Sequence, residues 1–336
     1  MASVKDRFDL KLLLSAEAKR SDEMLALFDW MIEQDKDMPD LATLPIAEAR
    51  VWRARQSQRT NAELPPVAGV ERLHLAGLNG APSIACDLIE PPGAEPGCVV
   101  FLHGGGWAFG DLDSHTRLAR LLAVETEKRV LYVDYRLAPE HPFPAPLEDC
   151  VAAWRWIVGK SETDPRFHGP LGVAGDSAGA NLAVALILRE MEYGRRLPDV
   201  GLLFYGVYDD DTDSPSYARF AAGYGLARAG MMKFWEYYAP SYAHGSPRED
   251  ALLCPVRASS AALARLPPLY LNAAGLDPLM CDTLKFAARL EDADAIFEVN
   301  VHPGVHHGFM QQTARLAEAR RAMDLAIAFF RNHAPR

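Results

Sequence analysis

The sequence predicts an α/β fold in which a mostly parallel β-sheet carries helices on both faces. From about Val70 onward, short runs typical of buried strands alternate with longer runs of helical periodicity. Parallel strands require such alternation, because the connection between two of them is usually a helix. The chain has 336 residues, which is enough for one large α/β domain with an attached smaller unit.

Eight apolar runs are the expected strands. The first two meet near Asn79-Gly80, a dipeptide typical of a tight turn, and they predict an antiparallel pair. We therefore expect a mixed sheet of about eight strands, which is within the range of large α/β enzymes. The runs are residues 70–77, 83–91, 98–103, 130–135, 171–175, 202–206, 268–275 and 296–302.

Helices are expected between the later strands. Their apolar residues recur at helical spacing, and the last of them runs from about 313 to 332. The other four begin near His115, Pro146, Ser177 and Cys281.

Two segments interrupt this alternation. In the first, Met24, Leu27, Phe28 and Met31 recur at helical spacing, and the second contains the aromatic stretch "MMKFWEYYAPSY". A long insertion at the edge of a sheet usually covers a site. We therefore expect N-terminal cap helices and a lead-in at residues 1–64, a catalytic core at 65–206 and 267–336, and a cap insertion at 207–266.

Composition narrows the classes of function. The net charge is −10 and no basic cluster is present, which argues against a nucleic-acid partner. No segment has the uncharged length of a membrane span, and the first residues, "MASVKDRFDLKLLL", contain too short an apolar run for a secretory signal. The five cysteines are dispersed without C-x-x-C spacing, which predicts free thiols and neither a disulfide framework nor a zinc site. We therefore expect a cytoplasmic protein that does not insert stably into membranes.

A run of acidic residues follows the sixth predicted strand. The stretch "DDDTDSP", from Asp209 to Pro215, has no pattern of ligand spacing around it. We expect a solvated turn there rather than a cation site.

A serine stands where a predicted strand becomes a predicted helix. In "VAGDSAGANLAVAL", Ser177 lies between Gly175 and Gly179, after a short apolar run and before an Ala- and Leu-rich one. This is the G-x-S-x-G pattern of a nucleophile elbow, in which the glycines let backbone pass close by while the hydroxyl projects above the sheet. The N-terminal N–H groups of the following helix would favour negative charge beside the serine.

A serine nucleophile needs a base and a group that orients this base. In α/β sheets such groups lie beyond the carboxyl ends of the strands. Asp277 is the first carboxylate after the seventh predicted strand, and His306 and His307 follow the eighth. The order Ser, Asp, His is that of one known triad arrangement. The residue types leave His306 and His307 open as the base, and they do not exclude Asp282 or His302.

Consecutive glycines follow the third predicted strand. "HGGGW" contains His103, Gly104, Gly105 and Gly106, and such a run can turn its backbone N–H groups toward one oxygen atom. A flexible loop or a phosphate-binding loop is the alternative. A phosphate loop is disfavoured because the chain has no G-x-x-x-x-G-K-[ST] motif and no G-x-G-x-x-G motif that opens a helix.

Taken together and in order, these motifs are similar to those of a known protein family. "HGGGW", "DYRLAPEHPFPAPLED", "GDSAG", "DPL" and "HHGF" occur in the order seen in the hormone-sensitive-lipase-like branch of the α/β-hydrolase esterases. The resemblance extends from about Val70 to the C-terminus, and "GYGLARAGMMKFWEYYAPSY" is similar to the cap insertion of this family. It implies an α/β-hydrolase fold with a helical cap.

The resemblance also implies a role for each matching residue. Ser177 would be the nucleophile, His307 the general base and Asp277 the orienting acid. The backbone N–H groups of Gly104, Gly105 and Ala178 would form the oxyanion hole. His103 would hold the glycine loop, and a structural buttress would be formed by Tyr135, Arg136 and Glu140. The chain departs from the family pattern at Ala180, where a glycine is common, and at Cys281-Asp282, where an acidic pair is common.

The implied function is that of a carboxylesterase without metal or cofactor. Its substrates would be esters of small to medium acyl groups, held in an apolar pocket that includes Trp107, Phe109 and Tyr224. The resemblance also makes a homodimer through the edge strand near Phe297 a hypothesis. A hormone receptor on the same fold is the main alternative, but receptors of this type resemble the family while lacking the triad histidine. Amide or lactone hydrolysis would use the same triad, whereas epoxide hydrolases and dehalogenases have an aspartate where this chain has Ser177.

Overall fold

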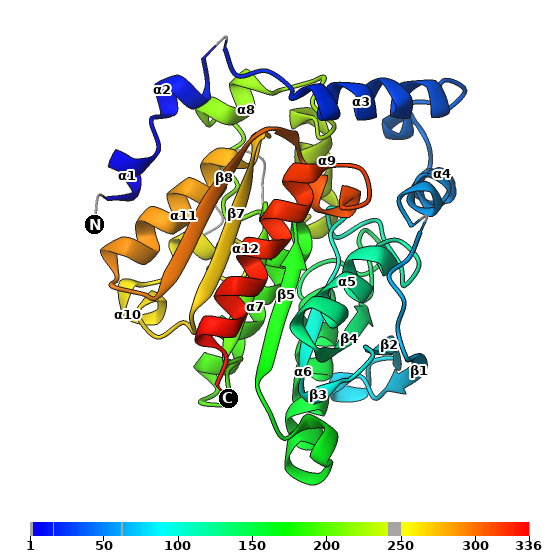
Figure 1. Ribbon diagram of the computed structural model, residues 1–336, viewed down its shortest axis with the longest axis vertical. Coiled ribbons are helices and arrows are strands. Elements are labelled where there is room, and N and C mark those ends of the chain that lie inside the picture. Colours follow the sequence, from blue (N-terminus) through cyan, green and yellow to red (C-terminus); the bar gives the residue numbers. More distant parts are fainter. Residues whose placement is uncertain (1–2, 16, 62, 241–249, 336) are drawn as a thin grey trace.

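A single mixed sheet organises the protein. The computed structural model describes residues 3–15, 17–61, 63–240 and 250–335. Within these ranges, eight strands pair in the order β1-β2-β4-β3-β5-β6-β7-β8 (Figure 1). β2 runs antiparallel to both neighbours, and the other neighbouring pairs are parallel. The predicted mixed and mostly parallel sheet is thereby confirmed.

All eight predicted strands are present, with ends that differ by a few residues from those expected. Asn79 and Gly80 both have positive φ, and they turn the chain between β1 and β2 as their residue types predict. The strands are β1 (Gly69–Leu75), β2 (Ile84–Glu90), β3 (Glu95–Leu102), β4 (Lys128–Asp134), β5 (Leu171–Asp176), β6 (Val200–Phe204), β7 (Leu269–Leu276) and β8 (Phe297–His306).

Helices cover both faces of the sheet (Figure 1). One face carries α5 (Thr116–Thr126) and α12 (Ala317–His333). The opposite face carries α6 (Ala145–Thr163), α7 (Ala178–Glu192) and α11 (Met280–Asp292). α7 is buried on nearly all sides, and its small alanine side chains let it lie close to the sheet behind Ser177.

The last helix begins later than predicted. Residues Phe309–Gln312 form a short 3₁₀ helix, η5, and α12 starts at Ala317. The carbonyl of Gln312 accepts from the N–H groups of Arg315 and Leu316, both at 2.8 Å. These bonds close a separate turn, which interrupts the helix expected from residue 313 onward.

The two segments predicted as caps are helical. The N-terminal segment contains α1 (Val4–Arg7), α2 (Leu10–Leu13), α3 (Asp22–Gln34) and α4 (Ile46–Thr60). The segment between β6 and β7 contains α8 (Pro215–Arg219), α9 (Arg228–Tyr238) and α10 (Ser260–Leu263), and its residues 241–249 lie outside the described ranges. In Figure 1, α3 lies across the end of the sheet at which β7 and β8 finish. The four-part division of the chain stays a prediction.

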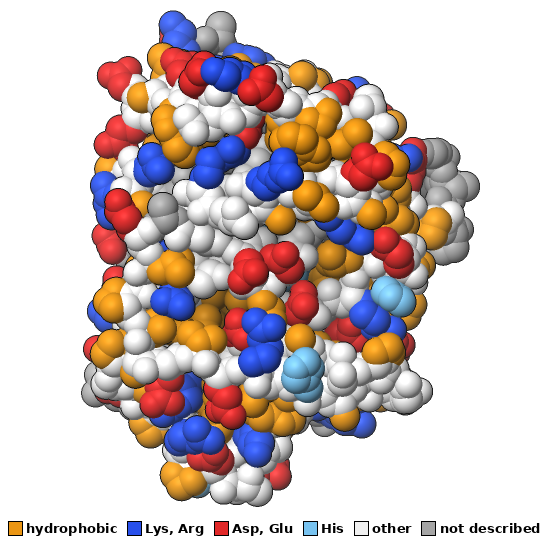
Figure 2. Space-filling view, turned by 90° about the vertical axis from the view of Figure 1, so that its right-hand side faces the viewer, with side chains coloured by type: hydrophobic (Ala, Val, Ile, Leu, Met, Phe, Trp, Pro, Cys, Tyr) orange, Lys and Arg blue, Asp and Glu red, His pale blue; other side chains and the backbone are white. Residues whose placement is uncertain are grey.

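The surface carries mixed charges. Figure 2 shows the face that includes α4 and β1, where the described Lys and Arg side chains lie among Asp and Glu. Such interspersion produces no large field of one sign on this face. None of the helices in the described part of the chain has the length and hydropathy of a membrane span.

All five cysteines are buried, and none of them forms a disulfide bond within the described residues. Burial raises the pKa of Cys86 and of Cys98 to about 12. The predicted thiols without disulfide partners are therefore present, and burial favours the neutral form of Cys86 and Cys98.

Candidate active site

Ser177 occupies a strained turn between β5 and α7. Its φ and ψ are 54° and −119°, a conformation that non-glycine residues rarely adopt. A Cβ atom on Gly179 would lie 1.9 Å from the carbonyl oxygen of Leu102, and one on Gly175 would lie 2.5 Å from the Gly179 carbonyl carbon. The turn is thus tight enough to require glycine on both sides of the serine, as the G-x-S-x-G pattern predicts.

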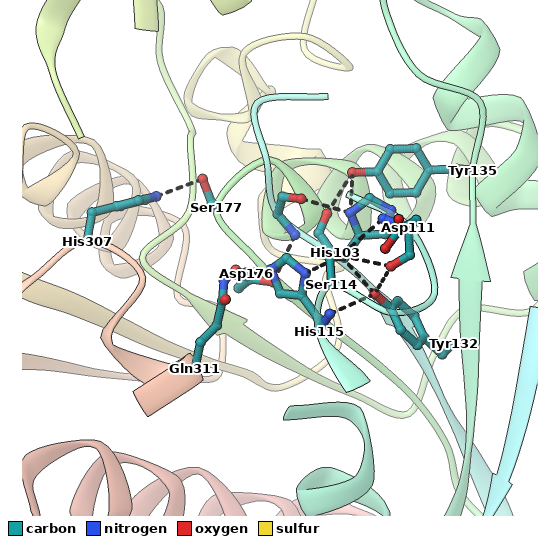
Figure 3. Close-up of polar contacts among 11 residues, drawn as sticks. His103, Asp111, Ser114, His115, Tyr132, Tyr135, Asp176, Ser177, His307 and Gln311 are labelled. Atoms are coloured by element: carbon teal, nitrogen blue, oxygen red, sulfur yellow. Dashed lines mark hydrogen bonds and ion pairs between the residues drawn. The ribbon is translucent and has the colours of Figure 1, made fainter. Parts of the chain in front are cut away.

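The structure brings Ser177, His307 and Asp277 into one hydrogen-bonded line. His307 Nε2 lies 2.9 Å from Ser177 Oγ, and His307 Nδ1 lies 2.7 Å from Asp277 Oδ2. Figure 3 shows the imidazole of His307 pointing toward the hydroxyl of Ser177. The buried carboxylate of Asp277 places the ring proton on Nδ1, which leaves Nε2 free to accept the serine proton.

The three alternative residues have other partners. His306 Nε2 accepts from Arg20, and His302 Nδ1 lies 2.6 Å from Glu318 Oε1. Asp282 accepts the backbone N–H groups of two residues after β6, at 3.2 and 3.3 Å. Burial and the nearby Asp209 raise the pKa of Asp282 well above its usual value. The distances therefore favour His307 and Asp277 as the residues that act with Ser177.

The prediction for Gly104 needs correction. Its N–H donates to Asp176 Oδ1 at 2.9 Å and is thus already used. The N–H groups of Gly105, Gly106 and Ala178 make no hydrogen bond within the described part of the chain. Gly105 and Gly106 have φ values of +118° and +60°. Glycine adopts such positive φ values readily, and they orient the successive peptide groups of the loop. The sequence assigned an available N–H group to Gly104, whereas the structure leaves that of Gly106 available.

Asp176 was part of a quoted motif but had no assigned role in the sequence analysis. Asp176 directly precedes the nucleophile, and its buried carboxylate binds the glycine loop through the Gly104 N–H. His115 Nε2 lies 3.4 Å from its Oδ2 (Figure 3). Burial disfavours the charged form, but His115 and the Gly104 N–H outweigh burial and lower the pKa of Asp176. No local pattern reveals this role, because Asp176 and Gly104 are 72 residues apart.

His103 and Tyr135 hold the start of the glycine loop. The Tyr135 hydroxyl donates to the His103 carbonyl at 2.6 Å, and the two rings stack with centroids 4.3 Å apart. His103 Nδ1 lies 2.8 Å from the Gly104 carbonyl oxygen. Burial and the neighbouring His115 lower the pKa of His103 to about 3, so this imidazole is neutral at ordinary pH. These contacts are those of a structural residue, which is the role implied by the family resemblance.

Arg50 of α4 ties the N-terminal region to the same loop. Its guanidinium donates to the carbonyl oxygens of Ala108 and Ala138 and forms a bidentate pair with Glu140, each bond being 2.8 Å long. Arg136 forms a similar pair with Asp149. Glu140 and Arg136 are therefore anchoring residues, as expected for a buttress, whereas the sequence did not single out Arg50.

The predicted pocket residues lie in different environments. Trp107 is fully buried and stacks on Tyr238 with centroids 4.2 Å apart, so it belongs to the core and is not placed to line a pocket. Phe109 is nearly buried and packs edge-on against Phe234 of α9. Tyr224 is half-buried. A Cβ atom on Gly106 would lie 2.4 Å from the ring of Phe234, so this ring adjoins a free N–H group of the glycine loop.

The solvated turn predicted for Asp209 to Pro215 is confirmed in part: Asp211 and Asp213 are exposed and residues 212–214 form a turn or bend, but the start of the run is different. Asp209 is buried and pairs with Arg257 and Lys285, and Asp210 also pairs with Arg257. Ligand atoms of Asp209, Asp210 and Cys254 lie within 4.8 Å of one another. The two cationic side chains satisfy the carboxylates of this cluster, and a metal ion at this position would have to compete with them.

Comparisons with known proteins are consistent with this geometry. A family model described as alpha/beta hydrolase fold matches residues 99–311. The chain is 35% identical to esterase LipI of Mycobacterium tuberculosis over 72% of this chain and 74% of the relative. It is 33% identical to ethyl acetate hydrolase of Pseudomonas putida, over 73% of this chain and 77% of the relative.

Solved structures agree with the sequence relatives. An ester hydrolase from the metagenome of Lake Arreo superimposes with a TM-score of 0.85 at 34% identity, covering 94% of this chain and 99% of that one. A thermostable esterase from Pseudomonas putida superimposes with a TM-score of 0.86 at 27% identity, covering 96% of this chain and 100% of that one.

Proposed function

Because this chain belongs to the hormone-sensitive-lipase-like esterases of the α/β-hydrolase superfamily, we propose that it hydrolyses esters of small to medium acyl groups through an acyl-enzyme. The observation that carries this proposal is the line of hydrogen bonds from Ser177 through His307 to Asp277, with distances of 2.9 and 2.7 Å. A nucleophile, a base and an orienting acid within hydrogen-bond reach are the arrangement that acyl transfer requires.

The first half of the reaction forms the acyl-enzyme. His307 Nε2 takes the proton of Ser177 while the serine oxygen attacks the ester carbonyl carbon. Asp277 stabilises the imidazolium that results. The N–H groups of Gly105, Gly106 and Ala178 are the donors available to the oxyanion, and removal of one such donor typically costs about 10²–10³ in turnover.

The first half ends when His307 gives its proton to the leaving alcohol and the C–O bond of the ester breaks, which leaves the acyl group on Ser177. The second half releases the acid. A water molecule then loses a proton to His307 as it attacks the acyl-enzyme, and Ser177 regains a proton when the acid departs. These steps need no group other than the residues named here.

Aromatic side chains support the choice of small to medium acyl groups. Phe234 lies against Gly106, and Phe109 packs on Phe234 with ring centroids 5.9 Å apart. Bulky rings close to the donors of the glycine loop would limit the length of a chain that enters from this side. The activity in the name of one relative, ethyl acetate hydrolase, also supports a short substrate.

The cytoplasmic location and the homodimer stay predictions. Arg7 of α1 donates to the carbonyl oxygen of Val299 on β8, at 3.0 Å. The N-terminal region therefore already occupies part of the edge strand near Phe297, through which the homodimer is expected. Light scattering would determine the number of chains per particle.

A series of p-nitrophenyl esters from acetate to long acyl chains tests the proposal. We expect hydrolysis that falls with acyl length, and we expect Ser177→Ala to abolish it while the circular dichroism spectrum stays that of the folded protein. His307→Ala should be far more damaging than His306→Ala. Ordinary rates in Ser177→Ala, or no hydrolysis of any ester by the folded wild-type protein, would refute the proposal.

A further inference from the structure

The segment before α3 contacts the end of β8, which leads to His307. The Ser21 N–H donates to the Gly304 carbonyl oxygen at 3.0 Å. Gly304 has a φ of +72°, and a Cβ atom there would lie 2.8 Å from the Ser21 nitrogen. The two segments therefore approach so closely that a side chain on Gly304 would separate them.

Arg20 joins three parts of the chain at this point. Its Nε–H donates to His306 Nε2 at 2.7 Å, and its terminal nitrogen donates to the Gly223 carbonyl oxygen. Its guanidinium carbon lies 4.3 Å from the ring centre of Phe28 and 5.0 Å from that of Tyr224. One side chain thus links α3, the segment between β6 and β7, and the end of β8.

The ring of His306 is enclosed by the same partners. Phe28 and Tyr224 both meet it edge-on, with centroids at 5.1 and 5.6 Å. Arginine has no acceptor and keeps its protons, so His306 Nε2 must be the unprotonated acceptor of this bond. Burial and the positive charge of Arg20 lower the pKa of His306 to about 4, and the bond therefore persists at neutral pH.

His306 and His307 are consecutive residues with different tasks. Arg20, Phe28 and Tyr224 fix the first, whereas the second contacts Ser177 and Asp277. A rotation of the shared backbone would move the imidazole of His307 away from the serine. A displacement of about 1 Å can lower the rate roughly 100-fold, because proton transfer requires close alignment.

We propose that Arg20 is a positioning residue for the ester hydrolysis. Through His306 it holds the backbone that presents His307 to Ser177, and through Gly223 and Tyr224 it holds the neighbouring segment over the same loop. The inference rests on the proposed function, because it concerns the base of that reaction. It differs from a purely structural role, in which loss of Arg20 would lower the stability of the fold and leave the turnover of the folded protein unchanged.

Two variants of Arg20 and one control test this role with p-nitrophenyl butyrate as the probe. We expect Arg20→Ala to lower kcat roughly 10- to 100-fold and to change KM by less than about threefold. Arg20→Lys keeps the positive charge and one donor nitrogen, and we expect it to recover part of kcat. Arg55→Ala removes an exposed arginine of α4 and should leave kcat within about twofold of wild type. Circular dichroism at the assay temperature establishes that each variant is folded.

His306→Ala removes the same bond from the other side. If Arg20 acts through His306, the double variant should be no slower than the slower single variant. Unchanged kcat in folded Arg20→Ala, or additive losses in the double variant, would overturn the proposal. If Arg20→Ala does not fold, Arg20→Lys and His306→Ala decide, and wild-type kcat in both would overturn it.

Ser177→Ala separates failure of this inference from failure of the proposed function. An inactive Ser177→Ala variant together with a fully active Arg20→Ala variant would refute the role of Arg20 alone. An active Ser177→Ala variant would refute the proposed function, and the role of Arg20 with it.

Discussion

Replacement of Asp277 by asparagine removes the charge of the acid and keeps its shape. Oδ2 of Asp277 lies 2.7 Å from His307 Nδ1, and Oδ1 accepts the Leu279 N–H at 2.9 Å. Asparagine has one acceptor oxygen in place of two. If this oxygen keeps the bond to Leu279, the amide NH₂ faces Nδ1, and the ring proton of His307 must move to Nε2.

A His307 that carries its proton on Nε2 cannot accept the proton of Ser177. The opposite orientation of the amide restores the productive tautomer, but it leaves the buried Leu279 N–H unsatisfied, which costs about 1–3 kcal/mol. The lost attraction between carboxylate and imidazolium adds about 4 kcal/mol at a separation of about 4 Å and an effective dielectric constant of about 20. The sum, about 5–7 kcal/mol, corresponds to a loss of roughly 10⁴–10⁵ in kcat.

The assay is the steady-state hydrolysis of p-nitrophenyl butyrate at neutral pH. Asp282→Asn is the matched control, because Asp282 is also a buried carboxyl that follows β7. The pKa of Asp282 is raised well above its usual value by burial and by Asp209, so asparagine resembles its protonated form. We expect the control to stay within about tenfold of wild type. A small effect of Asp277→Asn together with a large effect of Asp282→Asn would refute the assignment of the acid.

Three further predictions concern the turn, the pocket and the dependence of stability on pH. Gly179→Ala would place a Cβ atom 1.9 Å from the Leu102 carbonyl oxygen, so we expect a loss of roughly 3 kcal/mol or more in urea unfolding, and wild-type stability would contradict the geometry. Phe234→Ala opens space beside Gly106, and kcat/KM should shift toward longer p-nitrophenyl esters, whereas an unchanged profile would place the acyl chain elsewhere. Burial and the nearby Asp111 raise the pKa of Asp134 from 3.8 to about 6. The contribution of protonated Asp134 to the free energy of unfolding is therefore complete below pH 3.8 and is lost as the pH rises through 6. Asp134→Asn should therefore raise the melting temperature relative to wild type above pH 6 and not below pH 3.8, and an equal change at both would contradict the burial argument.

The sequence predicted those features that depend on neighbours in the chain. Gly175 and Gly179 flank Ser177 within one turn, so the pattern alone indicates a strand-to-helix elbow. Asp277 and His307 follow strands that run parallel to β5, and parallel strands end at the same edge of the sheet. Their meeting with Ser177 could therefore be expected before the structure was known.

The features that the sequence did not predict depend on distant partners. Gly104 and Gly106 belong to one run of glycines, and nothing in the run itself tells them apart. They differ because the carboxylate of Asp176, which is 72 residues from Gly104 in the sequence, accepts the N–H of Gly104. The environments of His306 and His307 differ because Arg20, 286 residues before His306, bonds the first of them.

Side-chain burial was also beyond prediction from local pattern. Trp107 follows the glycine run in the sequence, but it stacks on Tyr238 of α9 and is fully buried. Asp209 stands in a run of acids, but Arg257 and Lys285 reach it from later parts of the chain. In both cases the decisive contact joins residues that no short window of sequence contains.

The five buried cysteines give this protein an internal reporter of unfolding. A thiol reagent reacts with the thiolate, and burial both shields these side chains and, for Cys86 and Cys98, raises the pKa to about 12. Labelling of the native thiols therefore requires the chain to open, and its rate measures how often the regions around β2, β3 and α6 do so. Mass spectrometry of the labelled chain would resolve these openings one region at a time, without a reporter group added to the protein.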